Sequence, residues 1–110
     1  MKTLQQQPAR TKIPSDHVKD LANAVTIMHG CPCVWYRTSY VHEWLNGKSV
    51  WKGLVEVFTL IGHPTANMAF AWSWKDKAGE IRDFAVLKAP LIKSAAEAVR
   101  SVIASAKQKW

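Results

Sequence analysis

The sequence predicts a two-layer α+β domain in which a helix, a four-stranded antiparallel meander and a second helix follow one another. Apolar residues recur at helical spacing near both ends, and four segments between them are rich in β-branched and aromatic residues. Short Gly-, Asn- and Pro-containing connections favour antiparallel neighbours. Each helix carries a single apolar stripe, so we expect both helices on one face of the sheet.

Composition and length predict one domain over residues 15–110, preceded by a flexible basic arm over residues 1–14. The arm has no periodicity and contains Pro8 and Pro14. No apolar run reaches the ~18 residues that span a bilayer. The N-terminus lacks the apolar core of a secretory signal, so a cytoplasmic location without membrane attachment is expected.

The net charge of +7 is concentrated at the two ends of the chain. Its terminal cations are Lys2, Arg10, Lys12, Lys107 and Lys109, and without them the charge is +2. Nucleic-acid-binding domains usually gather their cations on one face of the fold. The charge distribution therefore favours solvated ends, although basic tails could add weak affinity for polyanions.

Capping signals delimit the two helices. Ser15 can cap a first helix over residues 15–29, and Gly30 is a natural stop. Ser94 and Glu97 fit a capping box for the last helix. The apolar stripe of the last helix comprises Ala95, Ala98, Val99, Val102, Ile103 and Ala106.

The four strands are predicted at residues 33–44, 49–61, 67–75 and 80–88. Asn46-Gly47 is typical of a type I′ hairpin turn, which needs positive φ at both central positions. Connections at Gly62-His63-Pro64-Thr65 and at residues 76–79 separate the other strands. The Asn46-Gly47 turn implies four cross-strand pairs: Leu45 with Lys48, Trp35 with Phe58, Arg37 with Glu56, and Tyr40 with Gly53.

The third strand separates small from large side chains. Ala69 and Ala71 alternate with Phe70, Trp72 and Trp74. Small residues let a helix approach closely, so we expect the alanines beneath the helices and the aromatic residues on the uncovered face. This assignment assumes a connection of five residues at 62–66, and a slip of one residue would reverse it.

An uncovered aromatic face predicts a partner. Soluble monomers seldom expose more than a few hundred Å² of contiguous apolar surface. The leading hypothesis is therefore a non-enzymatic interaction module that homodimerises through this face. Its candidate interface residues are Trp35, Leu54, Phe58, Phe70, Trp72 and Trp74.

Catalytic and metal-binding patterns are weak in this sequence. His29, Cys31 and Cys33 could contribute to a metal site, but a structural zinc site needs four ligands. No metal or other cofactor is expected, and no catalytic residue is assigned. One alternative is a small-ligand or enzymatic pocket between helices and sheet. Its candidate residues are Tyr36, Tyr40, His42 and His63.

Nucleic-acid binding is a second alternative. Aromatic side chains on an open sheet, with Arg37 and Lys52 nearby, could stack on bases. The order helix–strands–helix loosely resembles the double-stranded-RNA-binding domain, whose β-turn carries a Gly-Pro-His-type segment similar to Gly62-His63-Pro64. The chain departs from that family in having four predicted strands and only Lys93 at the start of the last helix.

Several short motifs resemble a family of small bacterial proteins with no known activity. They are VEVF at 55–58, GHPTA at 62–66, AFAW at 69–72 and FAVL at 84–87, together with HGC at 29–31 and VHE at 41–43. The resemblance covers residues 25–105 and supports the domain limits. It implies no reaction, and Cys33 lies outside the pattern.

Overall fold

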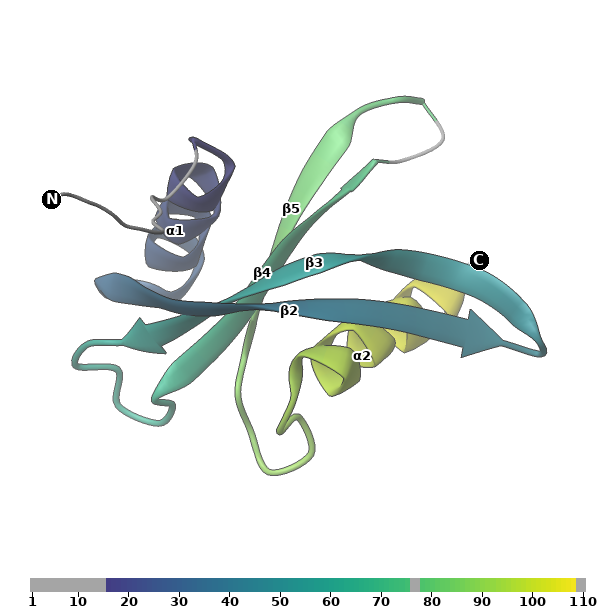
Figure 1. The fold of residues 1–110 in the computed structure, drawn as a ribbon. Helices are drawn as coiled ribbons and strands as arrows, with labels where there is room; N and C mark the ends of the chain where they lie inside the picture. Colours follow the sequence, from purple (N-terminus) through teal and green to yellow (C-terminus); the bar gives the residue numbers. More distant parts are fainter. Residues whose placement is uncertain (1–15, 76–77, 109–110) are drawn as a thin grey trace, which may run out of the picture.

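One antiparallel sheet lies between two helices (Figure 1). The computed structural model describes residues 16–75 and 78–108, so the predicted arm at 1–14 lies outside the described residues. The strand order in the sheet is β2-β3-β4-β5. The elements are α1 (Asp16–His29), β2 (Cys33–Leu45), β3 (Lys48–Leu60), β4 (Met68–Lys75), β5 (Ile81–Leu87) and α2 (Ala95–Gln108). The predicted order and the antiparallel meander are confirmed.

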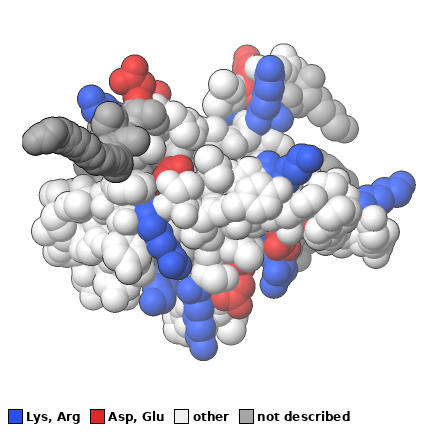
Figure 2. Space-filling model, in the orientation of Figure 1, with Lys and Arg blue, Asp and Glu red and all other residues white. Residues whose placement is uncertain are grey.

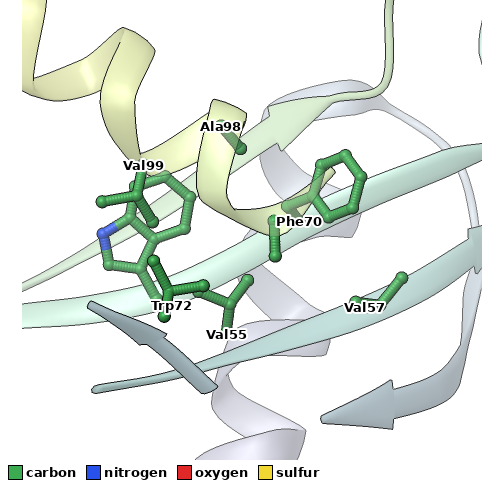
Figure 3. Packing of buried hydrophobic residues seen from close by; sticks show 8 residues of the cluster. Val55, Val57, Phe70, Trp72, Ala98 and Val99 are labelled. Atoms are coloured by element: carbon green, nitrogen blue, oxygen red, sulfur yellow. The ribbon is translucent and has the colours of Figure 1, made fainter. Parts of the chain in front are cut away.

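The placement of the helices differs from the expected two-layer arrangement. Leu21 and Val25 of α1 pack against Phe58, Ala69 and Ala71 on one face of the sheet. Helix α2 packs on the opposite face, and its inward residues Ala98 and Val99 meet a layer of apolar side chains (Figure 3). Sheet residues in this layer are Val55, Val57, Phe70 and Trp72. Each face of the sheet is therefore covered by one helix.

Side-chain size explains which helix covers which face. The small side chains of Ala69 and Ala71 let α1 lie close enough to bury Leu21 completely. On the other face the indole of Trp72 fills the space beneath the small residues Ala98 and Val99. Large side chains on the sheet thus oppose small ones on α2, as close packing of a core requires.

The β3–β4 register accounts for the exchange of faces. The sequence predicts a connection of five residues at 62–66. In the structure Thr59 pairs with Met68, so β4 is shifted by one residue relative to β3 and the connection is longer than predicted. Two contacts favour this longer connection. The Ile61 amide donates to the Pro32 carbonyl (3.0 Å) rather than to β4, and the Leu60 amide donates to the Asn67 carbonyl (2.9 Å). A one-residue shift turns every side chain of β4 to the opposite face.

The β2–β3 hairpin contains two irregularities that cancel. Asn46 (φ 52°) and Gly47 (φ 77°) form the turn as predicted, and Leu45 pairs with Lys48. Trp35 also pairs with Phe58 as predicted, but the register changes between Trp35 and Arg37 and again between Glu43 and Trp44. Between these points the predicted pairs are wrong. The observed pairs there include Arg37 with Val57, Thr38 with Glu56, Tyr40 with Leu54, and Val41 with Gly53.

The local shift exchanges the faces of residues 37–43. Val41 and Glu43 lie on the α2 side, where Val41 is buried and Glu43 accepts a hydrogen bond from Nε of Arg100 (2.8 Å). Tyr40 and His42 therefore lie on the other face. The ring of Trp51, rather than Tyr40, covers the backbone of Gly53, where a Cβ would stand 2.9 Å from the indole.

Candidate functional site: the aromatic face of the β2–β3 ribbon

The β2–β3 ribbon extends beyond α1 and presents exposed aromatic rings on the face opposite α2. Strand β4 pairs with β3 only over Glu56–Thr59, so most of the ribbon has no third strand beside it. Figure 1 shows α1 at one end of this ribbon and α2 beneath it. We call the exposed surface the aromatic face, and it comprises Trp35, Tyr40, His42, Trp44 and Leu54.

Three rings of β2 form a ladder on this face. Tyr40, His42 and Trp44 alternate along the strand, so they project on the same side. The His42 and Trp44 rings stack at 4.2 Å with an interplanar angle of 23°, and Tyr40 meets His42 edge to face at 6.4 Å. Nε2 of His42 is 2.8 Å from Oγ of Ser49 on β3. These contacts fix the rings relative to one another before any partner binds.

Glu56 lies beneath the aromatic face and orients the Trp35 side chain. Its side chain is 3% exposed and accepts a hydrogen bond from Nε1 of Trp35 (2.8 Å) and another from Oγ1 of Thr38. Both donors are neutral groups of β2. The expected cross-strand partner Arg37 instead lies 5.8 Å from the ring centre of Tyr36. Glu56 is thus a positioning residue that holds the Trp35 indole.

The predicted interface residues divide into exposed and buried groups. Trp35 and Leu54 lie on the aromatic face and are 45% and 55% exposed. The prediction is wrong for Phe58, Phe70 and Trp72, which are all buried. The register shift of β4 places Phe70 and Trp72 beneath α2, whereas Phe58 keeps its predicted face, which α1 covers. Trp74 is half-buried on the α2 side, beside Trp51 and Phe84.

The four predicted pocket residues do not meet. Tyr40 and His42 share the aromatic face, and Tyr36 is the extra residue at the β2 irregularity. His63 lies in the β3–β4 connection, where its Nδ1 accepts hydrogen bonds from the amides of Thr65 and Ala66 (both 3.1 Å). The imidazole therefore shapes the turn.

Sequence reasoning missed Tyr40 and Trp44 as members of the exposed face, because it assumed a regular hairpin. The alternation of aromatic residues at 40, 42 and 44 is the signal that marks one face of a strand. A bulge has no equally clear signature in the sequence. The membership of the aromatic face could therefore be assigned only from the structure.

The His42–Ser49 pair does not form a catalytic constellation. A serine nucleophile needs a base that is itself oriented by a third group. Within the described residues no carboxylate hydrogen-bonds to the His42 ring, so we interpret the contact as a cross-strand link that holds the ladder.

The polar side chains of His29 and Cys33 contact backbone carbonyls of neighbouring elements. His29 at the end of α1 contacts the Ala85 carbonyl through Nε2 (2.8 Å), and the thiol of Cys33 donates to the Ala22 carbonyl (3.5 Å). Both cysteines are free. Over residues 16–75 and 78–108, no group of three or more His, Cys, Asp or Glu side chains is placed to hold a metal ion.

We expect the Cys33 thiol to react slowly with alkylating reagents. Burial raises the pKa of Cys33 above its usual 9.0, a hydrogen bond from Thr26 opposes the rise, and the charge of Cys31 adds to it. A raised pKa leaves less of the nucleophilic thiolate near neutral pH. Iodoacetamide should label Cys33 several-fold more slowly in the folded protein than in urea. The labelling rate of the folded protein should still rise with pH above pH 9. Peptide mass analysis measures both rates, and equal rates at neutral pH would contradict this expectation.

Charge is scattered over the surface in the view of Figure 2. Several Lys and Arg side chains lie near one another on the lower part of this view, others are isolated, and much of the surface is uncharged. On the aromatic face the exposed charged neighbour is Lys52, which pairs with His42 across the strands. The described helices include none that is long and apolar enough to cross a membrane.

Comparisons with protein-family models, curated proteins and solved structures gave no match to this chain. The resemblance to a family of small bacterial proteins stays a prediction. Functional inference therefore depends on the geometry of the chain itself.

Proposed function

We propose that the protein is a non-enzymatic interaction module that homodimerises through the aromatic face. The observation that carries this proposal is the exposure of two aromatic side chains of this face: Tyr40 is 64% exposed and Trp44 59%. Tyrosine and tryptophan are the residues that most often dominate binding energy at protein interfaces. Rings already ordered by stacking lose little conformational entropy when a partner covers them.

The size of the face suits the centre of a dimer interface. An aromatic side chain contributes ~150–250 Å², so the exposed fractions of Trp35, Tyr40 and Trp44 amount to roughly 400 Å² of mainly ring surface. Leu54, opposite Tyr40, extends this area. A stable interface buries about 800 Å² per partner, with an apolar centre and a polar rim. The aromatic face can supply the apolar centre of such an interface, and the polar residues around it can supply the rim.

Charge and symmetry favour a second copy as the partner. A two-fold interface brings the same residues of both chains together, so a strongly charged face would repel itself. Glu56 is buried beneath the face, and the long side chain of Lys52 can extend to the rim. Because one patch meets its own copy, the assembly closes at two chains.

A cytoplasmic location forms part of the proposal. Cys31 and Cys33 are both free, and a disulfide across a single intervening residue would close a small, strained ring. Free thiols suit a reducing compartment, where disulfides are rare.

A charge placed in the aromatic face should separate the dimer. Tyr40→Glu buries a carboxylate against its own copy, so we expect this variant to sediment as a monomer of 12.4 kDa while the wild type sediments at twice that mass. Ile81→Glu is the matched control, because Ile81 is 70% exposed on β5 and lies outside the aromatic face. Circular dichroism should show equal folding of all three proteins.

A monomeric wild type at about 100 μM, or a dimeric Tyr40→Glu variant, would contradict the proposal. Nucleic-acid binding is the competing use of the same rings, since bases stack on aromatic side chains. It would take the place of dimerisation if the wild type is monomeric and binds single-stranded RNA in a salt-dependent manner that Tyr40→Glu abolishes. If the wild type neither dimerises nor binds RNA, the aromatic face does not have the proposed role.

A further inference from the structure

A second feature of the molecule is an open hollow on the side of the β3–β4 and β5–α2 connections. Its volume is about 700 Å³. Both connections lie along the lower part of Figure 1. The polar residues that line it are His63, Thr65, Asn67, Lys88 and Lys93. None of them belongs to the aromatic face, so this site is independent of the proposed dimer.

The lining is rich in hydrogen-bond donors and positive in charge. Lys88 and Lys93 contribute two ammonium groups, and Thr65 and Asn67 contribute a hydroxyl and an amide. The residues that line the hollow include no Asp or Glu. Glu97, the acid in the first turn of α2, is engaged with the Lys93 amide (2.9 Å) and accepts from Oγ of Ser94 (3.4 Å). The lysine charges are therefore not neutralised by a carboxylate of the lining.

The turn geometry assigns a donor role to His63. Its Nδ1 accepts two backbone hydrogen bonds, from the amides of Thr65 and Ala66. The proton of the neutral imidazole must therefore be on Nε2, which makes that nitrogen a donor. Nε2 has no hydrogen-bond acceptor among the residues that the structure describes, so it can donate to a ligand. The same contacts hold the ring in place, so the donor is ordered in advance.

We infer that this hollow binds a small phosphorylated molecule. A phosphate monoester carries close to two negative charges near neutral pH and presents three acceptor oxygens. Two lysines match that charge, and the imidazole, hydroxyl and amide donors match the oxygens. A carboxylate has one charge and two oxygens and would leave part of this set unused. The volume is that of sites for small organic ligands.

Titration of the full-length protein with inorganic phosphate and with adenosine monophosphate tests the inference. Chemical shifts of backbone amides, recorded at constant ionic strength, should change saturably at residues 63–67 and 88–93 for both probes. Replacing both Lys88 and Lys93 with alanine should weaken phosphate binding by about tenfold. The control Lys19→Ala/Lys48→Ala removes the same charge at two exposed positions elsewhere and should leave the affinity within about twofold. His63→Asn keeps an acceptor for the turn but removes the Nε2 donor, and it should weaken binding while the protein stays folded.

Three results would overturn the inference. They are linear, non-saturating shifts for both probes, an equal loss of affinity in the two double variants, and shift changes that avoid residues 63–67 and 88–93. Saturable binding of a short RNA without binding of either small probe would likewise exclude a small phosphorylated ligand. None of these results depends on whether the chain forms a dimer.

Discussion

Replacing Trp72 with alanine should destabilise the protein by about 3–5 kcal/mol, the range for removing a fully buried aromatic side chain. Trp72 is 0% exposed, and its indole stacks on Phe84 at 5.6 Å while Trp51 lies 6.2 Å away. Ala98 and Val99 of α2 close the space above it. The small residues of α2 cannot move in to fill the cavity. Urea unfolding followed by circular dichroism measures the loss.

Trp72→Phe is the matched control. The indole Nε1 of Trp72 is buried without a hydrogen-bond partner among the described residues. Phenylalanine keeps a stacked ring beside Phe84 and removes this unpaired donor, which offsets part of the lost packing. We expect its cost to be well below that of alanine. A cost below about 1 kcal/mol for Trp72→Ala would show that α2 does not cover Trp72. Equal costs for both variants would contradict a stabilising role of the ring stacked beside Phe84.

Phe58→Ala should cost a similar amount on the opposite face of the sheet, about 3–5 kcal/mol. Phe58 is 0% exposed and packs with Leu21, Val25 and Ala69 beneath α1. Removing the ring takes away the largest buried side chain of this cluster. The free energy of unfolding in urea again gives the measure.

Ile61→Ala is the comparison for Phe58→Ala, because Ile61 follows β3 directly and is 51% exposed. Its truncation should cost less than about 1 kcal/mol, as for most exposed positions. A small effect of Phe58→Ala would contradict a covered face, since the sequence alone places Phe58 on an open one. Large effects at both Phe58 and Trp72 are expected only when each face carries its own helix.

Turn and cap chemistry made the elements of the fold predictable. Asn46-Gly47 defined its hairpin correctly because few residues accept positive φ. Ser94 and Glu97 begin α2 as predicted, and the Glu97 amide donates to Oγ of Ser94 (3.2 Å). A capping box also expects the Glu97 carboxylate to accept from the amide of Ser94. In the structure it accepts from the amide of Lys93. Such signals are local, so they can be recognised in a single sequence.

The assignment of faces was not predictable to the same degree, because it depends on single-residue shifts. The two irregularities of the β2–β3 hairpin cancel, so correct pairs at Leu45–Lys48 and Trp35–Phe58 conceal a shifted register between them. The β3–β4 shift depends on where the Ile61 amide finds an acceptor. Both choices are made by tertiary contacts that the local pattern does not encode.

The candidate site shows the same division. Sequence reasoning correctly placed Trp35 and Leu54 on an exposed surface. It did not foresee that α1 and α2 would each cover one face, leaving the ribbon ladder as the exposed remainder. The surface proposed to bind a partner therefore lies on β2 rather than on β4.

The most direct test of the dimer is an isotope-filtered nuclear Overhauser experiment on an equal mixture of labelled and unlabelled protein. If two chains meet through the aromatic face, contacts between chains will connect the rings of Tyr40 and Trp44 with each other or with the methyl groups of Leu54. Contacts between chains that involve other surfaces only, or none at a concentration of about 1 mM, would contradict it.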